Sequence, residues 1–269
     1  MTSCRVCAAD ATHTHDGKLL GHLDVSYFRC PACEYWFTEE PYWLEEAYSH
    51  KISSNDEGLV QRNLTIARQL GVLLPRLFPD GPYVDWAGGV GLLVRLMRDA
   101  GFDYYWDDAF ADNLLADGFT WADNAERLAG PATFVSAIEV LEHVPKPIEF
   151  FNDVFEKTGT RALFFTECLH DNTFDPNWWY LLPDSGQHIS FFSAKTLRTI
   201  ADALGVTLVS HGDSHLFSKD PIEQKRFSRA MRTSRTITYL TRTPARLSGA
   251  PSSLAWLGRN ARSSSLHLR

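Results

Sequence analysis

Two pairs of cysteines near the start of the chain have the spacing of a metal site. They are Cys4 with Cys7 and Cys30 with Cys33, and two residues separate the members of each pair. This spacing places two thiolates on one tight turn, so both sulfurs of a pair can face one ion and two pairs complete a tetrahedron. The pattern predicts a zinc ion with four cysteine ligands, although His13 or His15 could replace one of them. Because four thiolates leave no open coordination position, we expect this zinc to be structural.

A glycine-rich segment lies between an expected strand at residues 82–86 and an expected helix at residues 92–98. It reads Asp85-Trp86-Ala87-Gly88-Gly89-Val90-Gly91. Glycines in such a turn let backbone amides approach a ligand, and the helix N-terminus adds positive potential. A second acid, Asp107, ends the next expected strand, where a carboxylate can accept both ribose hydroxyls of a nucleoside cofactor. The glycine spacing differs from the G-x-G-x-x-G of dinucleotide folds, which disfavours NAD.

This segment resembles the first motif of the class I S-adenosylmethionine-dependent methyltransferases. In that family an acid and a spacer precede a G-x-G-x-G-like loop, and here alanine stands at the first glycine position. The resemblance implies that S-adenosylmethionine is the cofactor and that Asp107 binds its ribose. The residues that it assigns to the methionine part of the cofactor are Asp85, Ala87, Gly88, Gly89 and Gly91.

Two later motifs support the same resemblance. Residues 138–145 read Ile-Glu-Val-Leu-Glu-His-Val-Pro and look like the E-V-L-E-H-V-P motif of many small-molecule methyltransferases. Residues 187–193 resemble the H-[IL]-S-x-[FY]-S segment that precedes the last helix of the family. The resemblance implies that Glu139 lies at the cofactor, and that the catalytic residues are Glu142, His143 and His188, with an imidazole as general base.

A zinc module followed by such a domain resembles the deoxysugar C-methyltransferases that act on nucleotide-linked sugars. Those enzymes carry a Y-H-E-H-x-S-[YF] motif, which reads Ser-Gly-Gln-His-Ile-Ser-Phe at residues 185–191 of this chain. Gln187 replaces the carboxylate that would enolise a ketosugar. We therefore expect O-methylation of a sugar or nucleotide-linked sugar in glycan or natural-product biosynthesis, with His188 or His143 as the base. C-methylation of a nucleotide-linked ketodeoxysugar is the alternative.

The elements that must position these residues alternate between strand and helix. A strand and a helix flank the glycine-rich turn, as described above. Apolar runs predict further strands at 103–106, 133–138, 162–166 and 206–209, and helical spacing predicts further helices at 148–157 and 196–204. Such alternation is typical of a parallel sheet with helices on both faces. Together with the resemblance, it predicts an α/β Rossmann-like class I methyltransferase domain, with a mostly parallel seven-stranded sheet and a small N-terminal Cys4 zinc ribbon.

Changes of pattern divide the chain into four segments. We expect a zinc-binding module at residues 1–40 and a helical linker at 41–79, whose helix follows Asn55-Asp56-Glu57. The methyltransferase domain then covers 80–218, and a basic tail of weak or peripheral order covers 219–269.

Charge is distributed unevenly between these segments. The tail holds eleven Lys and Arg against two acids, a balance of +9, so the total of −7 leaves −16 for the rest of the chain. A body this acidic repels a phosphate backbone, which argues against nucleic acid as the partner and for a small-molecule acceptor. Neither a long apolar run nor a signal peptide is present in the sequence, which predicts a soluble cytoplasmic protein.

Several interpretations stay open at the level of the sequence. Zinc modules also precede methyltransferase domains in RNA-modifying enzymes, and the fold could bind a cofactor or partner without turnover. The basic tail could touch an anionic membrane through Leu254, Trp256 and Leu257. The aromatic run at 177–183 could stack on a sugar ring or serve as a lid packed on its own domain. The sequence predicts no oligomeric state.

Overall fold

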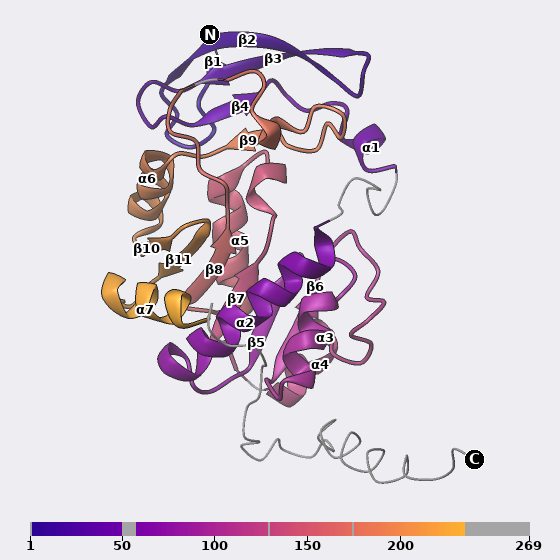
Figure 1. Ribbon diagram of the computed structural model, residues 1–269, viewed down its shortest axis with the longest axis vertical. Coiled ribbons are helices and arrows are strands. Elements are labelled where there is room, and N and C mark those ends of the chain that lie inside the picture. Colours follow the sequence, from indigo (N-terminus) through magenta and orange to yellow (C-terminus); the bar gives the residue numbers. More distant parts are fainter. Residues whose placement is uncertain (1, 50–57, 129, 174, 235–269) are drawn as a thin grey trace, which may run out of the picture. The chain divides into compact units, whose positions relative to one another are not determined.

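The computed structural model describes residues 2–49, 58–128, 130–173 and 175–234. It divides into two compact units that interleave along the sequence, Met1–Glu57 with Phe134–Ser228 and Gly58–Thr133 with Arg229–Arg269. In Figure 1 the first unit is drawn in indigo and again in pink to orange, and the second in purple to magenta. The cysteine pairs therefore belong to the same unit as the second half of the predicted catalytic domain.

An antiparallel sheet of five strands carries the N-terminal part of the first unit (Figure 1). Its main feature is a long hairpin, in which apolar and polar residues alternate along the second strand, so that Val25 and Tyr27 are buried. The strands in spatial order are β1 (Thr2–Ser3), β2 (Asp10–Leu19), β3 (Leu23–Arg29), β4 (Trp36–Thr38) and β9 (Ser190–Phe191).

The last strand of this sheet comes from far along the chain. In the antiparallel pair of β4 and β9, Trp36 lies opposite Phe191. Tyr27, Trp36 and Phe191 are buried together with Tyr180 and Leu181. The N-terminal sheet and the segment around residues 180–191 therefore share one apolar core.

The rest of the first unit is built on four further strands. β7 (Phe134–Ala137) and β8 (Ala162–Thr166) are parallel, as predicted, and helix α5 (Pro147–Thr158) connects them. β11 (Ser214–Ser218) runs antiparallel to β8, and β10 (Thr207–His211), which follows helix α6 (Ala194–Leu204), pairs with β11.

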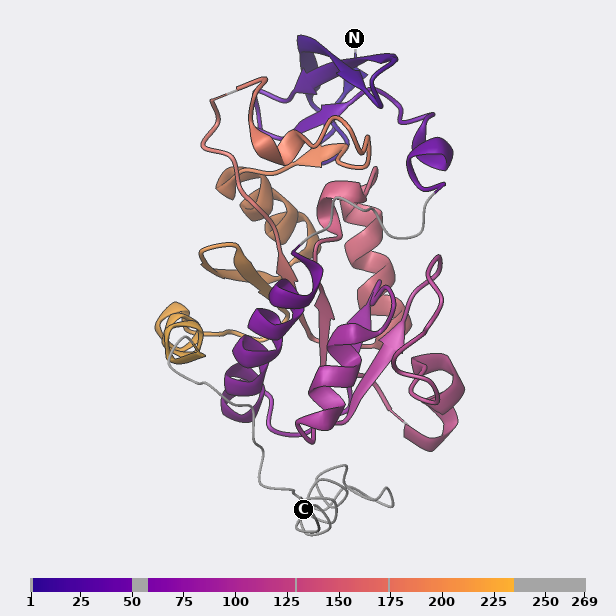
Figure 2. The same ribbon diagram turned by 45° about the vertical axis from the view of Figure 1, so that its right-hand side comes forward.

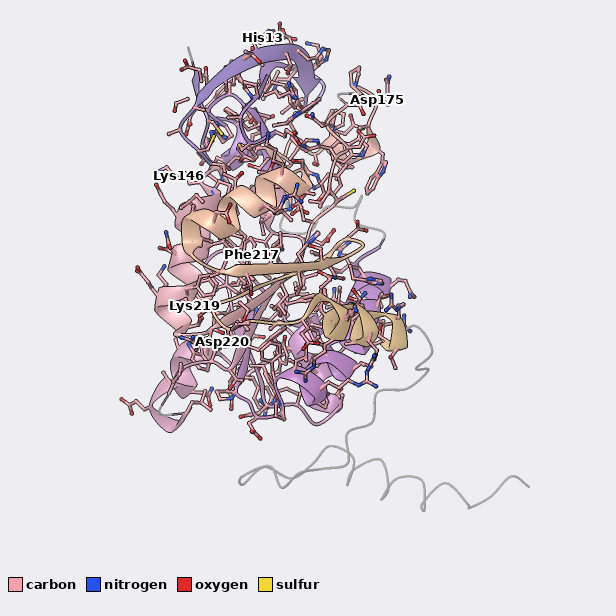
Figure 3. The ribbon with its side chains drawn as sticks, turned by 90° about the vertical axis from the view of Figure 1, so that its left-hand side faces the viewer. His13, Lys146, Asp175, Phe217, Lys219 and Asp220 are labelled. Atoms are coloured by element: carbon pink, nitrogen blue, oxygen red, sulfur yellow. The ribbon has the colours of Figure 1, made fainter. Side chains whose placement is uncertain are left out.

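Aromatic packing holds β11 in this arrangement. Phe217, labelled on its strand in Figure 3, lies with its ring centroid 4.9 Å from Phe151 of α5 and 4.9 Å from Phe165 of β8. All three rings are buried. The reversed strand is thus fixed by contacts with residues 50 to 70 positions earlier in the sequence.

The second unit contains the glycine-rich segment. Parallel strands β5 (Tyr83–Trp86) and β6 (Tyr104–Asp107) flank helix α3 (Leu92–Asp99), and α4 (Trp121–Leu128) follows. α2 (Leu59–Leu77) precedes them and packs beside α3 (Figures 1 and 2). The first unit supplies four strands to the α/β architecture, and the second unit supplies two. Within the described residues this makes six strands, whereas the sequence predicted seven.

Helix α2 confirms the helical spacing seen in the sequence. Its buried face includes Ile66, Ala67, Leu70 and Leu74, at the three- and four-residue steps of one helical stripe. Val60, at the start of the helix, is instead 58% exposed. The expected capping segment Asn55-Asp56-Glu57 lies outside the described residues.

The start of the basic tail is more ordered than predicted. Helix α7 covers Gln224–Ser234, and its residues Phe227, Ala230 and Met231 are buried at helical spacing. That apolar stripe was hidden in the sequence among arginines and serines. The remaining tail, including the proposed membrane-contacting residues, lies outside the described part of the chain. Among the described helices, none is both long and apolar enough to cross a membrane.

Candidate functional site

The four predicted metal ligands, here called the thiolate cluster, converge in the first unit. The Sγ atoms of Cys4 and Cys33 lie 3.6 Å apart, those of Cys7 and Cys30 lie 3.5 Å apart, and all four lie within 4.8 Å of one another. A tetrahedral zinc with Zn–S bonds of about 2.3 Å requires sulfurs about 3.8 Å apart. The cluster therefore has dimensions compatible with zinc.

The backbone around the two cysteine pairs repeats itself. Ala8 N–H donates to Cys4 O, and Glu34 N–H donates to Cys30 O, at 3.0 and 2.9 Å. The residue after each second cysteine is left-handed, with φ of 60° at Ala8 and 63° at Glu34. Two equivalent turns thus aim their thiols at one point, as expected from the spacing.

Hydrogen bonding within the thiolate cluster moves the pKa values of its thiols apart. The pKa of the Cys4 thiol is lowered to about 5, chiefly because the Cys33 thiol donates a hydrogen bond to it. That same bond, together with burial, raises the pKa of Cys33. His13 and His15 are not part of the cluster, and His13 lies on the outer hairpin, where its Nε2 is 2.8 Å from Asp16 Oδ1 (Figure 3).

The predicted cofactor loop, residues 87–91, forms a sharp turn between β5 and α3 in the second unit; we call it the glycine turn. Its backbone is left-handed at Ala87 (φ 57°), Gly89 (φ 54°) and Gly91 (φ 84°). Gly91 caps the N-terminus of α3. The glycines are explained by these angles, and Ala87 occupies a conformation that glycine would adopt without strain.

Neighbouring residues of the second unit hold the glycine turn. Gly89 N–H donates to Asp108 Oδ2 at 2.9 Å, and Trp106 Nε1–H donates to Gly89 O at 2.8 Å. A Cβ added at Gly88 would come within 2.9 Å of Trp106, whereas one added at Gly89 would meet nothing within 4 Å. The sequence analysis did not identify Trp106 or Asp108, although both flank the predicted acid Asp107.

The two acids of the cofactor prediction lie at the ends of adjacent strands. Asp85 is buried on β5 and Asp107 is the last residue of β6, directly opposite Trp86 in the parallel pairing. Ligands of α/β folds bind at the carboxyl ends of parallel strands. The structure therefore brings Asp85, the glycine turn and Asp107 to one edge of the second unit, with open space beside Gly89.

The predicted catalytic residues meet in the first unit and form what we call the acid–imidazole cluster: Glu142, His143 and His188. One ligand atom from each lies within 4.8 Å of those of the other two, and His143 Nε2 is 4.0 Å from Glu142 Oε1. The ring centroids of His143 and His188 are 5.0 Å apart. Glu142 and His188 are buried, whereas a quarter of the His143 side chain is exposed.

Backbone hydrogen bonds join the two segments that carry this cluster. Ile189 N–H donates to Glu142 O at 2.8 Å, and Ser190 Oγ donates to Val144 O at 2.7 Å. The 3-10 helix η1 (Leu141–His143) thereby lies beside the strand β9. Residues 46 positions apart in the sequence are placed side by side.

Each imidazole is oriented by a backbone carbonyl. His143 Nδ1 lies 3.0 Å from Gln187 O, and His188 Nδ1 lies 2.6 Å from Tyr180 O. A carbonyl oxygen only accepts, so Nδ1 carries the proton in both rings and Nε2 is the acceptor in the neutral form. Burial, and then the neighbouring His143, lower the pKa of His188 to about 3.

Glu139 lies beside this cluster at the end of β7, in a strained conformation with φ of 55°. Its N–H donates to Thr166 Oγ1 at 2.9 Å, and the same hydroxyl donates to Glu139 Oε1 at 2.6 Å. The sequence analysis missed the neighbouring Glu167, which is fully buried. Burial, followed by the carboxylates of Glu142 and Glu139, raises its pKa well above the usual value.

The side chain of Gln187 has a defined partner. Gln187 Nε2 donates to Ala47 O at 2.9 Å, and Trp43 Nε1 donates to the adjacent Gly186 O at 2.7 Å. Two hydrogen bonds thus hold the loop that precedes His188 against the segment at residues 43–48. These contacts span about 140 residues of sequence, so no local pattern predicted them.

The aromatic run between β8 and His188 is divided between core and surface. Tyr180 is buried and Trp178 packs against the same apolar core, whereas Trp179 is 68% exposed. The run therefore serves largely as packing for the N-terminal sheet, and Trp179 alone of the three presents most of its ring to solvent.

Comparison with known proteins identifies the family of the central part of the chain. The family described as "Methyltransferase domain" matches residues 60–211. Among solved structures, the chain is similar to magnesium protoporphyrin IX methyltransferase from Synechocystis PCC 6803 with bound SAM, at 14% identity and a TM-score of 0.40, over 65% of this chain and 87% of that one. It is also similar to an O-methyltransferase family 2 protein from Planctomyces limnophilus DSM 3776 in complex with apigenin, at 14% identity and a TM-score of 0.44, over 66% and 65% of the two chains. No curated protein sequence matches the chain.

Proposed function

Because the chain belongs to the methyltransferase-domain family that matches residues 60–211, we propose that it transfers a methyl group from S-adenosylmethionine to a hydroxyl of a small, sugar-containing acceptor. The glycine turn is the observation that carries the cofactor assignment. Three left-handed residues within five positions, a buried acid before them and a second acid on the adjacent strand match the requirements of a nucleoside cofactor.

The residues present fit S-adenosylmethionine. The open space beside Gly89 leaves room for a ligand against the turn, and Gly91 begins a helix whose N-terminus adds positive potential. In this proposal Asp85 and the backbone of the glycine turn hold the methionine part, and Asp107 accepts the ribose hydroxyls. The cofactor supplies a methyl group already activated on a sulfonium, so the protein must chiefly align the acceptor and help it lose a proton.

The acid–imidazole cluster is suited to handling that proton. His143 and His188 both present Nε2 as an acceptor, because their Nδ1 protons are held by Gln187 O and Tyr180 O. We assign His188 or His143 to the base and Glu142 to stabilising the positive charge that develops on the imidazole.

The environment of Gln187 favours oxygen over carbon as the methylated atom. C-methylation beside a carbonyl requires a group that enolises the sugar, and Gln187 occupies the position of the carboxylate that would do so. Its amide donates to Ala47 O instead, which a carboxylate could not do. A ketosugar deuterated next to its carbonyl gives the test, since washout of deuterium into solvent together with C-methylation would overturn O-methylation.

We assign the thiolate cluster to a structural zinc. Four sulfurs at tetrahedral spacing leave no coordination position for a substrate. The ion would stabilise a sheet whose last strand carries residues next to His188.

Calorimetric titration with S-adenosylmethionine and, in parallel, with NAD tests the cofactor assignment. We expect binding of S-adenosylmethionine alone, weakened at least tenfold by Asp107→Ala, because losing charged hydrogen bonds costs about 1.5–3 kcal/mol. The control is Asp117→Ala, an exposed acid from the same stretch of the second unit. Binding of neither ligand, or equal loss in both variants, would contradict the assignment.

A further inference from the structure

The acid–imidazole cluster has a feature that general base catalysis does not require. A base needs one imidazole, yet two imidazoles and a carboxylate converge here on one point, with one ligand atom of each within 4.8 Å of the others. His143 Nε2 lies 4.0 Å from Glu142 Oε1. Three groups that can each bind a metal ion therefore converge at close range.

The tautomers make this convergence chemically unusual. Both Nδ1 atoms donate to backbone carbonyls, so in the neutral rings both Nε2 atoms direct lone pairs inward. The carboxylate of Glu142 adds a third set of lone pairs. Three electron-pair donors that face one point repel one another unless a cation lies between them.

Metal-binding histidines in proteins are held in the same way. The ring nitrogen that does not bind the metal donates to a backbone carbonyl or a carboxylate, which fixes the tautomer and orients the ring. Here Gln187 O and Tyr180 O serve as those acceptors. The ring of Tyr180 lies edge-on to His188 with centroids 4.7 Å apart, and the ring of Tyr48 lies in the same manner 6.1 Å from His143.

We propose that Glu142, His143 and His188 bind a divalent transition-metal cation, separate from the ion of the thiolate cluster. Two histidines and one carboxylate suit Mn²⁺, Fe²⁺, Co²⁺ or Zn²⁺, whereas Mg²⁺ and Ca²⁺ prefer ligands made of oxygen alone. Three protein ligands leave coordination positions open, as in catalytic rather than structural sites. The partly exposed side chain of His143 marks the open side of the site.

The site deepens the proposed function and rests on it for its role. A hydroxyl oxygen of the acceptor that reaches an open coordination position would lose its proton more easily, as water does on a bound metal. The cation would then perform the task that the proposed function gives to an imidazole base, and the two histidines would act as its ligands. Cation binding itself can be measured without any acceptor.

The test uses the full chain with its thiolate cluster loaded with zinc and verified by metal analysis. Mn²⁺, which competes poorly for thiolates, is titrated and followed by electron paramagnetic resonance and calorimetry. We expect one Mn²⁺ per chain in the wild type. Glu142→Gln and His188→Gln should each weaken binding by more than the 10–100-fold typical of changes outside the ligand set, whereas His22→Gln, on the exposed hairpin loop, should bind as the wild type.

The remaining outcomes separate the cation site from the proposed function. Absence of Mn²⁺ binding, or binding that survives both substitutions, would overturn the cation site, and intact titration with S-adenosylmethionine would leave the proposed function standing. Mn²⁺ binding without S-adenosylmethionine binding would support the cation site and contradict the proposed function. Should the variants fail to fold, electron spin-echo spectra of Mn²⁺ in the wild type decide, because coupling to imidazole nitrogen is expected and its absence contradicts the proposal.

Discussion

Adding one methyl group at Gly91 or at Gly89 separates the structural from the ligand-binding part of the glycine turn. At Gly91, with φ of 84°, the new Cβ would lie 2.9 Å from Asn113 Oδ1, 3.1 Å from Ala116 Cβ and 3.2 Å from Ala116 N. The left-handed backbone costs an alanine about 1–2 kcal/mol. Overlap with backbone atoms that cannot swing away adds about 1–3 kcal/mol. Gly91→Ala should therefore destabilise the protein by about 2–5 kcal/mol.

Gly89→Ala is the matched substitution, with the same change in composition two residues away. Gly89 is also left-handed, with φ of 54°, but its Cβ would meet nothing within 4 Å. Only the backbone cost of about 1–2 kcal/mol applies. Its methyl group instead enters the open space that we assign to S-adenosylmethionine, so this variant should bind the cofactor at least tenfold more weakly while folding nearly normally.

Urea unfolding followed by circular dichroism gives the two free energies, and calorimetry gives the two affinities. The reasoning about sterics is refuted if Gly91→Ala and Gly89→Ala destabilise equally within about 0.5 kcal/mol, the range of ordinary surface substitutions. Unchanged cofactor binding in Gly89→Ala would refute the assignment of the open space.

Three further predictions concern Ala87, the thiolate cluster and His215. Ala87→Gly should raise the free energy of unfolding by about 0.5–1 kcal/mol, because relief of left-handed strain at φ 57° exceeds the entropy gained by the unfolded chain; an unchanged urea midpoint would argue against strain. Cys30→Ser should release the bound zinc, measured by metal analysis, and retention of a full equivalent would show that the thiolate cluster does not hold it. Burial lowers the pKa of His215 to about 4, so as the pH falls from 6.5 the unfolded chain binds this proton first and the contribution of His215 should lower stability by about 1.4 kcal/mol per unit down to pH 4. In His215→Gln, whose amide can still donate to Glu167 O, the slope of stability against pH from urea unfolding at pH 4 to 7 should be smaller by that amount; the lowered pKa values of His170 and His188 and the raised pKa of Glu167 act in both proteins and cancel in the difference, so an equal slope would contradict the prediction.

Much of the fold could be predicted because its signals are local. The strand expected at residues 162–166 is Ala162–Thr166, and the helix expected at 148–157 is Pro147–Thr158. Both are apolar patterns bounded by residues that end them, such as the left-handed Gly159 after α5. The class I methyltransferase fold follows from such elements in order, and the spacing of the two cysteine pairs predicted the thiolate cluster by the same local logic.

The features that escaped prediction depend on contacts between distant residues. A two-residue strand such as β9 is too short to show periodicity in the sequence. It forms because it pairs with Trp36 and Phe37 at the edge of β4. The hydrogen bond from Gln187 Nε2 to Ala47 O likewise joins residues 140 positions apart. Motif resemblance placed His143 and His188 in one site, but it did not predict that the backbone carbonyls of Gln187 and Tyr180 fix their tautomers.

These distant contacts link the thiolate cluster to the acid–imidazole cluster. Cys33 O accepts from Thr196 Oγ1 at 2.9 Å, and Thr38 N–H donates to Ile189 O at 3.0 Å, one residue beyond His188. Loss of the metal should loosen the N-terminal sheet and with it the loop that positions His188.

The glycine turn and its two acids belong to the other compact unit. Protein stripped of zinc should therefore lose methyl transfer, and Mn²⁺ binding at the acid–imidazole cluster, while its affinity for S-adenosylmethionine changes by less than about threefold. Calorimetry before and after chelation, with readdition of zinc as the control, measures this. A loss of cofactor affinity as large as the loss of Mn²⁺ binding would mean that zinc binding stabilises both units and not the first unit alone.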